Sequence, residues 1–345
     1  MAAGLMTAAN SEEVRSISWE LAAMPIVMQS TYSPPPLFSN GHVQTVFPSV
    51  FRTVNGVHYQ RERIDTPDQD FVDVDWSRVG STRMALVLHG LEGDSGRAYV
   101  RGMVRALNKR GWDAAAMNFR SCSGECNRAL RFYHSGETQD IHTVLHHILE
   151  RDNYAEAALV GFSLGGNVIL KYLGDQGARL HPLVKKAVVF SVPCDLTSGA
   201  MKLSSLSNRL YMKRFLRMLR EKIRMKMQLM PGRITDEGYA DIKTFKEYDN
   251  RYTAPIHGFS SAEDYWTKAS SKPGLGRISI PALLVNAADD PFLAEPCYPL
   301  EEAKASTSLS LEIPDHGGHV GFVTFDRDGE YWSERRAVAF LNGEG

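Results

Sequence analysis

Residues 157–169 read AALVGFSLGGNVI, an apolar run followed by a run with helical spacing. The apolar run predicts a buried strand that ends at Phe162, and the spacing after it predicts a helix that begins near Leu164. Ser163 then lies on a very tight turn between them, in a strained backbone conformation. A side chain two positions before or after the serine would collide across such a turn, so glycine suits both 161 and 165.

This turn gives the serine a particular environment. The first amides of the following helix, together with the positive end of its dipole, point at the space above Ser163. A serine at a strand–turn–helix corner within G-x-S-x-G is the pattern called a nucleophile elbow. A serine hydroxyl is a poor nucleophile unless a base removes its proton. The pattern therefore predicts chemistry only if the chain also supplies a base and an acid.

Candidates for both groups follow in the expected order, which is serine, then acid, then histidine. HGGHVGF, after the last predicted strand, holds His316 and His319. We expect His319 to be the base, because small neighbours leave room for the elbow, and His316 to be structural. Asp289 and Asp290 end the preceding predicted strand, and either would hold the imidazole in the right tautomer. The spacing slightly favours Asp290, and the other aspartate would cap the turn before Pro291.

Two backbone amides are candidates for an oxyanion hole. One belongs to Leu164, directly after the serine. The other belongs to Leu91 in LHGLEGDSG, which follows another predicted strand. Gly90 and Gly93 allow the backbone to approach closely there. Chemistry built from these parts needs no metal and no organic cofactor.

The rest of the chain provides a sheet to carry these parts. Strands and amphipathic helices alternate from about residue 84 to the end, which predicts a parallel sheet with helices on both faces. Before them, residues 57–65 and 71–79 alternate apolar and polar side chains, as in an antiparallel edge pair. We therefore expect an α/β fold with about eight mostly parallel strands. The strand-like runs of the alternating part are MALVLHG, WDAAAMNF, AALVGF, KKAVVFSVP, PALLVNAADD and LSLEIPD.

The 345 residues suit one large domain over 32–345, preceded by an arm at 1–31 with a helix around Val14–Met28. An insertion at 195–275 interrupts the alternation. Within it, one helical face is apolar and the opposite face basic. We expect a lid over the site, with plain structural cover or a membrane-surface contact as alternatives. The apolar face is Met212, Phe215, Leu216, Leu219, Ile223 and Met227, and the basic face is Lys213, Arg214, Arg217, Arg220 and Arg224.

Composition excludes several other classes of protein. The formal net charge of -1 gives no global field for nucleic acid. Four scattered cysteines without a CxxC pair favour a reducing compartment, and Cys122 and Cys126 lack the histidine spacing of a metal site. No apolar run reaches the roughly 18 residues of a membrane span, and the first residues do not form a convincing signal peptide. We expect a cytoplasmic protein whose oligomeric state the sequence does not indicate.

A polar loop after the fourth predicted strand carries Arg120, Glu125, Arg128, His134 and Glu137. We interpret these residues as a buried hydrogen-bond and ion-pair network, with direct substrate contact as the alternative. Near the N-terminus, Asn40, His42 and Gln44 are expected to pin the arm by hydrogen bonds.

Taken together, the motifs resemble the YheT-like branch of the α/β-hydrolase superfamily over residues 33–342. The branch includes bacterial esterase-like proteins, yeast acyl-CoA:ethanol acyltransferases and animal phospholipases. The resemblance implies a triad of Ser163, Asp290 or Asp289, and His319, with an ester or thioester of an acyl chain as substrate. Some relatives carry an N-terminal membrane anchor, and none is evident in this chain. The motifs, in order, are NGHVQT, HGLEG, NFRSCSGE, YHSGET, GFSLGGN, DDPF and HGGHVGF.

The sequence therefore predicts a serine carboxylic-ester hydrolase that acts on a small-molecule acyl substrate through an acyl-enzyme on Ser163. An acyltransferase that passes the acyl group to an alcohol remains an alternative, as do lipase-like, phospholipase-like and thioesterase activities. A non-catalytic binding protein on the same fold is the third hypothesis. It fits least well, because serine, acid and histidine are all present.

Overall fold

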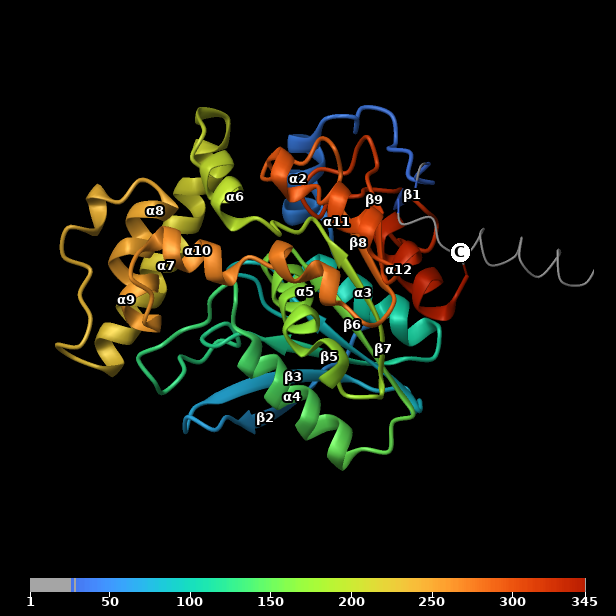
Figure 1. The fold of residues 1–345 in the computed structure, drawn as a ribbon, viewed down its shortest axis with the longest axis horizontal. Coiled ribbons are helices and arrows are strands. Elements are labelled where there is room, and N and C mark those ends of the chain that lie inside the picture. The colour runs from blue at the N-terminus through green and yellow to red at the C-terminus, as the bar shows by residue number, and fades with distance from the viewer. Residues whose placement is uncertain (1–25, 28, 345) are drawn as a thin grey trace, which may run out of the picture.

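The computed structural model describes residues 26–27 and 29–344. Its centre is a nine-stranded sheet in the order β1-β9-β8-β7-β6-β4-β5-β3-β2 (Figure 1). The strands are β1 (Ile26–Val27), β2 (Gln60–Asp65), β3 (Phe71–Ser77), β4 (Arg83–Leu88), β5 (Asp113–Asn118), β6 (Glu156–Phe162), β7 (Val184–Phe190), β8 (Ala282–Val285) and β9 (Leu309–Glu312).

The strand directions confirm the predicted sheet. β3 is antiparallel to both of its neighbours, β2 and β5, and every other pair is parallel. One expectation near the N-terminus was wrong. Ile26 and Val27 were expected to end a helix, but they form β1 alongside Leu311 and Glu312 of β9. Pairing with a distant strand overrides local helical spacing at these two residues, and the remainder of the expected helix lies almost entirely outside the described residues.

Helices cover both faces of the sheet. The helices are α2 (Gly41–Phe51), α3 (Ala98–Lys109), α4 (Thr138–Arg151), α5 (Leu164–Gln176), α6 (Leu196–Leu203), α7 (Arg209–Leu229), α8 (Phe245–Tyr248), α9 (Ala254–His257), α10 (Ala262–Ala269), α11 (Leu300–Ala305) and α12 (Trp332–Asn342). Short 3-10 turns are η1 (Gly177–Arg179), η2 (Leu206–Asn208), η3 (Tyr239–Asp241), η5 (Lys272–Arg277) and η6 (Glu295–Cys297), and η4 (Asp249–Thr253) is a π-helical turn.

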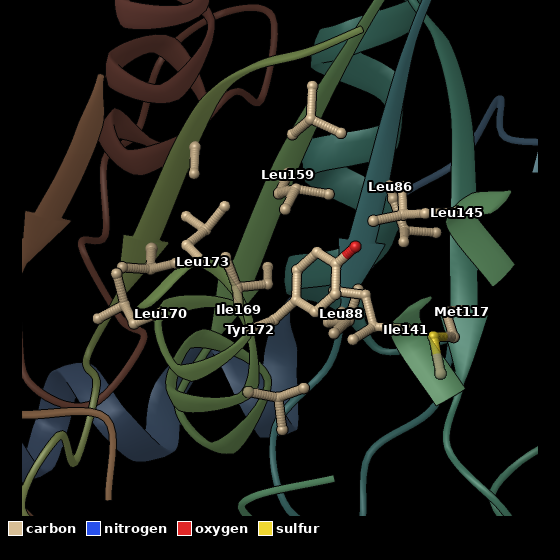
Figure 2. Packing of buried hydrophobic residues seen from close by; sticks show 14 of the residues in the cluster. Leu86, Leu88, Met117, Ile141, Leu145, Leu159, Ile169, Leu170, Tyr172 and Leu173 are labelled. Atoms are coloured by element: carbon tan, nitrogen blue, oxygen red, sulfur yellow. The ribbon is translucent and has the colours of Figure 1, made fainter. Parts of the chain in front are cut away.

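Two apolar cores follow from the alternation of side chains along the strands. Leu86 and Leu88 of β4 face a core that includes α4 and α5. Ala85 and Val87 of the same strand face the opposite core, which includes α3 and α12. Figure 2 shows the first core, where side chains of α4 and α5 pack onto β4, β5 and β6. Because strands buried on both faces are rigid, the loops at their carboxyl ends are held in fixed positions.

The segment between β7 and β8 forms a separate helical layer that includes α6 to α10, which we call the cap (Figure 1). Its longest helix is α7. Met212, Leu216, Leu219 and Ile223 of α7 are buried, at the spacing of one helical face. Met227 is partly buried against the same cluster, and the ring centroid of the half-buried Phe215 lies 6.0 Å from that of Phe245, which also packs on this cluster. Among the described helices, α7 included, none has both the length and the apolar character needed to cross a bilayer.

Helix α2 was not expected from the sequence. Asn40 caps it, because its side chain accepts hydrogen bonds from the amides of His42 and Val43. Pro48 lies inside the helix, which weakens the local helical signal. Tertiary contacts with the loops at the carboxyl edge of the sheet, described below, hold this helix in place.

Candidate active site

The candidate site is built around Ser163, at the junction of β6 and α5. Its backbone has φ 52° and ψ −119°, the strained conformation expected of the turn. The flanking glycines are required by close packing. A Cβ at Gly161 would lie 2.8 Å from the Cα of Gly166, and a Cβ at Gly165 would lie 2.5 Å from the carbonyl oxygen of His89. The predicted collisions are real, but they involve the helix backbone and β4 rather than the two glycines facing each other.

A chain of hydrogen bonds connects three distant parts of the sequence. His319 Nε2 lies 2.9 Å from Ser163 Oγ, and His319 Nδ1 lies 2.9 Å from Asp290 Oδ2. The Asp290 side chain is fully buried, and the amide of Phe292 donates to its Oδ1. This arrangement orients the imidazole so that Nε2 can accept the serine proton, while the carboxylate stabilises the imidazolium that results.

The neighbouring aspartate has different partners. Asp289 accepts a hydrogen bond from the amide of Gly318 at 2.8 Å, and its carboxylate lies 3.4 Å from His316 Nδ1. Burial raises the pKa of Asp289 above its ordinary value. The structure thus brings Asp290 to His319 and uses Asp289 and His316 to shape the loop below it. The expectation that the other aspartate caps the turn before Pro291 was wrong: the amide of Phe292 donates to Asp290, whereas Asp289 bonds to Gly318.

The NGHVQT segment, whose role the sequence left unexplained, packs against the histidine loop. Thr45 Oγ1 accepts a hydrogen bond from the amide of His319 at 2.9 Å, and Gln44 Oε1 accepts from the Tyr32 hydroxyl and the amide of Val323. A Cβ at Gly318 would lie 2.4 Å from the carbonyl oxygen of Gly41. The glycines of HGGHVGF are the sequence signal that something packs there, but they do not indicate what.

Gln44 therefore pins the arm as expected, and Thr45 is a positioning residue that sequence reasoning missed. His42 instead contacts the cap, with its Nδ1 3.1 Å from the hydroxyl of Tyr211. On the other side of the loop, Ser191 Oγ accepts from the amide of Val320. The loop that carries His319 is thus held from two sides, by hydrogen bonds from its backbone amides to the hydroxyls of Thr45 and Ser191.

The two candidate oxyanion amides lie next to the serine. A Cβ at Gly90 would lie 3.2 Å from the Cβ of Ser163, so the backbone before Leu91 passes directly over the elbow. Within the described residues, neither the Leu91 amide nor the Leu164 amide donates a hydrogen bond to another group. Buried amides normally find acceptors. Both are therefore free to bind a negatively charged oxygen that forms near Ser163.

His89 fixes the loop that carries Leu91. Its Nδ1 donates to the carbonyl oxygen of Gly90 at 2.7 Å, and its Nε2 accepts from the amide of Phe119. Burial lowers the pKa of His89 to about 3, so this ring stays neutral and keeps one tautomer. The hydroxyl of Tyr99 accepts from the Gly90 amide. These contacts give the loop a defined shape before any substrate binds.

A cavity lies between Ser163 and the cap, and we call it the cap cavity. Side chains of the cap form most of its wall, with Ser163 and His319 at one end. Most of them are apolar or aromatic, including Leu196, Leu203, Phe215, Leu219, Phe245, Tyr248, Tyr252, Ile256, Tyr265 and Trp266. An acyl chain fits such a surface better than a polar group does.

A second cavity reaches Ser163 and His319 from another side, between α2 and α7, and we call it the side cavity. Val46 and Ser49 of α2 form one wall, and Tyr211 and Arg214 of α7 form another. Arg97 also lines it. The serine therefore lies where the two cavities meet.

A buried ion pair connects the cap to the oxyanion loop. Lys222 Nζ of α7 lies 2.9 Å from Glu92 Oε1 and 2.8 Å from Cys122 Sγ. The Tyr133 hydroxyl donates to the same carboxylate and accepts from the Glu92 amide. Burial by itself would lower the pKa of Lys222, but Cys122 and Glu92 hold it above the ordinary value. The lysine therefore stays charged, and it fixes the residue next to Leu91.

The polar loop after β5 forms part of the network that the sequence suggested. Arg120 is buried and pairs with Asp68, Asp70 and Asp140. Arg131 links Asp68 to Glu137, and His134 Nε2 lies 3.6 Å from Glu137, so Arg120, His134 and Glu137 belong to one cluster. The side chains of Glu125 and Arg128 are exposed and pair instead with Arg63 and Asp65. His134 lines the cap cavity, so the alternative of a substrate contact applies to this residue. Asp65, Asp68 and Asp70 lie 50 to 63 residues before their arginine partners, which is why spacing within the loop did not reveal them.

Comparison with known proteins gives the family of this chain. The chain matches the alpha/beta hydrolase fold family over residues 86–326. It is 37% identical to the Escherichia coli (strain K12) protein named "Putative esterase YheT", an alignment that covers 83% of this chain and 85% of that protein. It is 29% identical to "Phospholipase ABHD3" of Homo sapiens, over 86% of this chain and 75% of the relative.

Solved structures give the same fold. An esterase of Pyrococcus furiosus, Pf2001, superimposes with a TM-score of 0.58 at 16% identity, over 91% of this chain and 100% of the esterase. The protein belongs to the α/β-hydrolase family. Within that family, its similarity to YheT confirms the YheT-like branch that the seven motifs indicated.

Proposed function

We propose that this protein is a serine hydrolase that cleaves carboxylic esters of acyl chains through an acyl-enzyme on Ser163. The observation that carries the proposal is the unbroken chain of hydrogen bonds from Ser163 Oγ through His319 to Asp290. The assignment to the carboxylic-ester hydrolases agrees with the esterases among its relatives and structural neighbours.

The proposed reaction has two halves. Ser163 Oγ attacks the acyl carbonyl carbon while His319 Nε2 takes the serine proton, and the amides of Leu91 and Leu164 bind the developing oxyanion. The tetrahedral intermediate collapses, the C–O bond to the alcohol breaks, and His319 returns the proton to the leaving alkoxide. Water then attacks the acyl-enzyme with His319 again as base. The bond between the acyl carbon and Ser163 Oγ breaks, His319 returns the proton to that oxygen, and the carboxylic acid leaves.

The two cavities suggest where each part of the ester binds. The cap cavity offers apolar walls for the acyl chain, and the aromatic and aliphatic side chains of α6 to α10 determine how long a chain fits. The side cavity then receives the alcohol group. In this proposal the cap is the lid expected from the sequence, inserted into a single hydrolase domain.

Transfer of the acyl group to an alcohol shares the same acyl-enzyme. The side cavity is a route by which an alcohol can reach it. Incubation with an activated acyl ester in the presence of ethanol separates the two activities. Free acid as the sole product supports hydrolysis, whereas ethyl ester accumulation supports the transferase.

A fluorophosphonate probe tests the proposal directly. We expect the native protein to be labelled and the Ser163→Ala variant to be unlabelled, because Ser163 is the serine, among those that the structure describes, whose hydroxyl contacts an imidazole held by a carboxylate. Ser279→Ala is the matched control, since Ser279 is an exposed serine whose hydroxyl only contacts a backbone carbonyl. Equal labelling of the native protein and Ser163→Ala would disprove the proposed nucleophile.

A panel of p-nitrophenyl esters with increasing acyl length, assayed on the same proteins, then gives the substrate class. We expect hydrolysis of at least one member by the native protein and by Ser279→Ala, and none above background with Ser163→Ala.

A further inference from the structure

Exposed apolar side chains collect at the mouth of the side cavity. Of the large apolar residues that are exposed within residues 26–27 and 29–344, most lie either on α2 and its neighbours or at the corner where α6 meets α7. We call these two groups the arm lobe and the cap lobe, and together the rim. The arm lobe is Leu37, Val43, Val46, Val50, Phe51 and Phe325, and the cap lobe is Met201, Leu206 and Leu210.

Most of the arm lobe lies on α2, a helix with no charged side chain. Val43, Val46 and Val50 recur at the spacing of one helical face on α2, and α2 contains no aspartate, glutamate, lysine or arginine. The ring of Phe47 joins this stripe to its neighbours, with ring centroids 5.2 Å from Phe51 and 5.9 Å from Phe325. Side chains that face solvent in this way normally mark an interaction site.

The cap lobe lies across the mouth from the arm lobe. Leu206 is 89% exposed and Leu210 is 82% exposed. Leu210 and Arg214 share one face of α7, four residues apart, and Arg214 lines the side cavity together with Val46 of α2. His42 of α2 and Tyr211 of α7 stack with ring centroids 5.8 Å apart, which joins the two lobes. Figure 1 shows α2 and α6 on the same side of the molecule, above the sheet.

Positive charge accompanies the cap lobe. Lys202, Arg209, Lys213, Arg214 and Arg217 are exposed, and none of them forms an ion pair with any of the residues that the structure describes. Cations without partners, interleaved with exposed leucines, fit an apolar layer beneath a negatively charged surface. They oppose self-association through the cap lobe, because two copies would bring like charges together.

We propose that the rim docks the protein on an anionic lipid bilayer, so that an acyl substrate passes from the bilayer through the side cavity to Ser163. The apolar lobes insert at the level of the acyl chains, and the cations of α7 contact the headgroups. This inference rests on the proposed ester-hydrolase function for the substrate's destination. The docking surface itself is independent of the catalytic residues.

Vesicle co-sedimentation tests the docking surface. Purified protein is mixed with vesicles of phosphatidylcholine alone and with vesicles that also contain phosphatidylglycerol. We expect binding to the mixed vesicles, and binding at least about tenfold weaker to phosphatidylcholine alone, because each cation near an anionic surface contributes to affinity.

Two variants test the cap lobe: one removes its exposed leucines and the other removes three of the cations beside it. Both avoid residues that line either cavity. Leu206→Ser combined with Leu210→Ser is expected to weaken binding to mixed vesicles by about tenfold or more, because less apolar surface is then buried in the bilayer on docking. Arg209→Gln combined with Lys213→Gln and Arg217→Gln is expected to remove the preference for phosphatidylglycerol.

A matched control lies on the same helix. Met225 and Leu229 are exposed apolar residues near the other end of α7, 39% and 51% exposed. At 1.5 Å per residue they lie roughly 20 Å or more from Leu210 along the helix axis. We expect Met225→Ser combined with Leu229→Ser to bind mixed vesicles like the native protein. If this control loses binding as much as the rim variant does, the rim is not the docking surface.

Three further readouts separate this inference from the proposed function. Ser163→Ala must bind mixed vesicles like the native protein. The rim variants must hydrolyse a water-soluble short-chain ester at the native rate. The same variants must lose activity on an ester of that class when it is presented in vesicles. Normal vesicle binding by the rim variants overturns the docking inference even if hydrolysis is confirmed. Absence of hydrolysis with intact vesicle binding overturns the proposed function alone.

Light scattering completes the test: a stable dimer that the leucine substitutions dissociate would assign the rim to a second copy and overturn bilayer docking.

Discussion

The floor of the site and its cap are held together by different kinds of contact. On the floor, Ser163, His319 and Asp290 are fixed by direct hydrogen bonds and by backbone packing so close that glycine is required. In the cap, α6 to α10 pack mainly through apolar and aromatic side chains. Separate polar contacts then tie the cap to the floor, among them Lys222 to Glu92 and Asn208 to the carbonyl oxygen of Pro291.

This difference separates two tasks. Backbone geometry cannot adjust without losing hydrogen bonds, so the floor suits steps that are the same for every substrate. Apolar side chains tolerate changes of shape, so the cap suits the choice among acyl chains. Changes to the floor are therefore expected to lower turnover of all esters alike, whereas changes to the cap are expected to alter relative rates.

The largest effect is expected where two adjacent aspartates have different partners. Asp290→Asn removes the carboxylate that holds the His319 tautomer, and we expect kcat to fall by about 10⁴-fold for every ester of the panel. Asp289→Asn leaves the Asp290–His319 contact intact and is expected to cost less than about tenfold. Steady-state kinetics on both variants checks this. Similar losses in the two variants would show that the acid has been misassigned.

A smaller loss is expected when the support of the histidine loop is removed. Thr45→Val deletes the acceptor for the His319 amide, and we expect kcat to fall by about tenfold at all acyl lengths, because small displacements of a base are costly. Thr45→Ser is expected to restore activity. Thr143→Val is the matched control, since Thr143 makes the same contact to the carbonyl four residues earlier as Thr45 does, but on α4. Steady-state kinetics that determine kcat and KM separately measure this effect. An unaltered kcat in Thr45→Val would refute the positioning role.

A change in the cap should alter selection without altering chemistry. Ala200 of α6 is buried and lines the cap cavity. Ala200→Leu fills part of that cavity, and we expect the ratio of long-chain to short-chain kcat/KM to fall by about tenfold while the shortest ester is hydrolysed at nearly the native rate. Ala240→Leu, at an exposed position of the cap, is the control. A uniform loss across all chain lengths in Ala200→Leu would contradict the assignment of the cap cavity to the acyl chain.

The smallest effect concerns stability of the cap. Asp249 lies in the π-helical turn, lines the cap cavity, and accepts hydrogen bonds from Thr253 and Trp266. Burial raises its pKa from 3.8 to about 6. The folded state therefore holds a proton that the unfolded state releases between about pH 4 and pH 6, and stability falls as pH rises through that window.

Asp249→Asn removes this titration; its amide oxygen can still accept from Trp266, and its amide nitrogen can donate to the Thr253 hydroxyl, which reverses that bond. We expect it to be more stable than the native protein above pH 6, by at most about 3 kcal/mol, with the difference shrinking toward pH 4. Denaturant unfolding across that pH range measures it, with Asp241→Asn, an exposed cap position, as control. A stability difference that is constant with pH would exclude the buried carboxylate as its source.

Much of the fold was predictable because its signals are local. Period-two burial along β4, the apolar strands and the helical stripe of α7 all reflect contacts that repeat within a few residues. By contrast, α2 contains a proline, and β1 consists of two residues that pair with β9. Both α2 and β1 depend on contacts with residues hundreds of positions away, so no short window of sequence predicts that they form.

For the site, the sequence by itself determined the elbow at Ser163 and the candidate base at His319, because steric limits on a tight turn and the order of groups along the chain leave few alternatives. Only the tertiary structure decided that Asp290 rather than Asp289 meets the imidazole, and that Thr45 supports it. Two adjacent aspartates lie at nearly the same sequence distance from the histidine, but their side chains point in different directions. Which of two adjacent side chains reaches a distant group is fixed by the loop's path in space, and that path is set by packing against α2 and the cap.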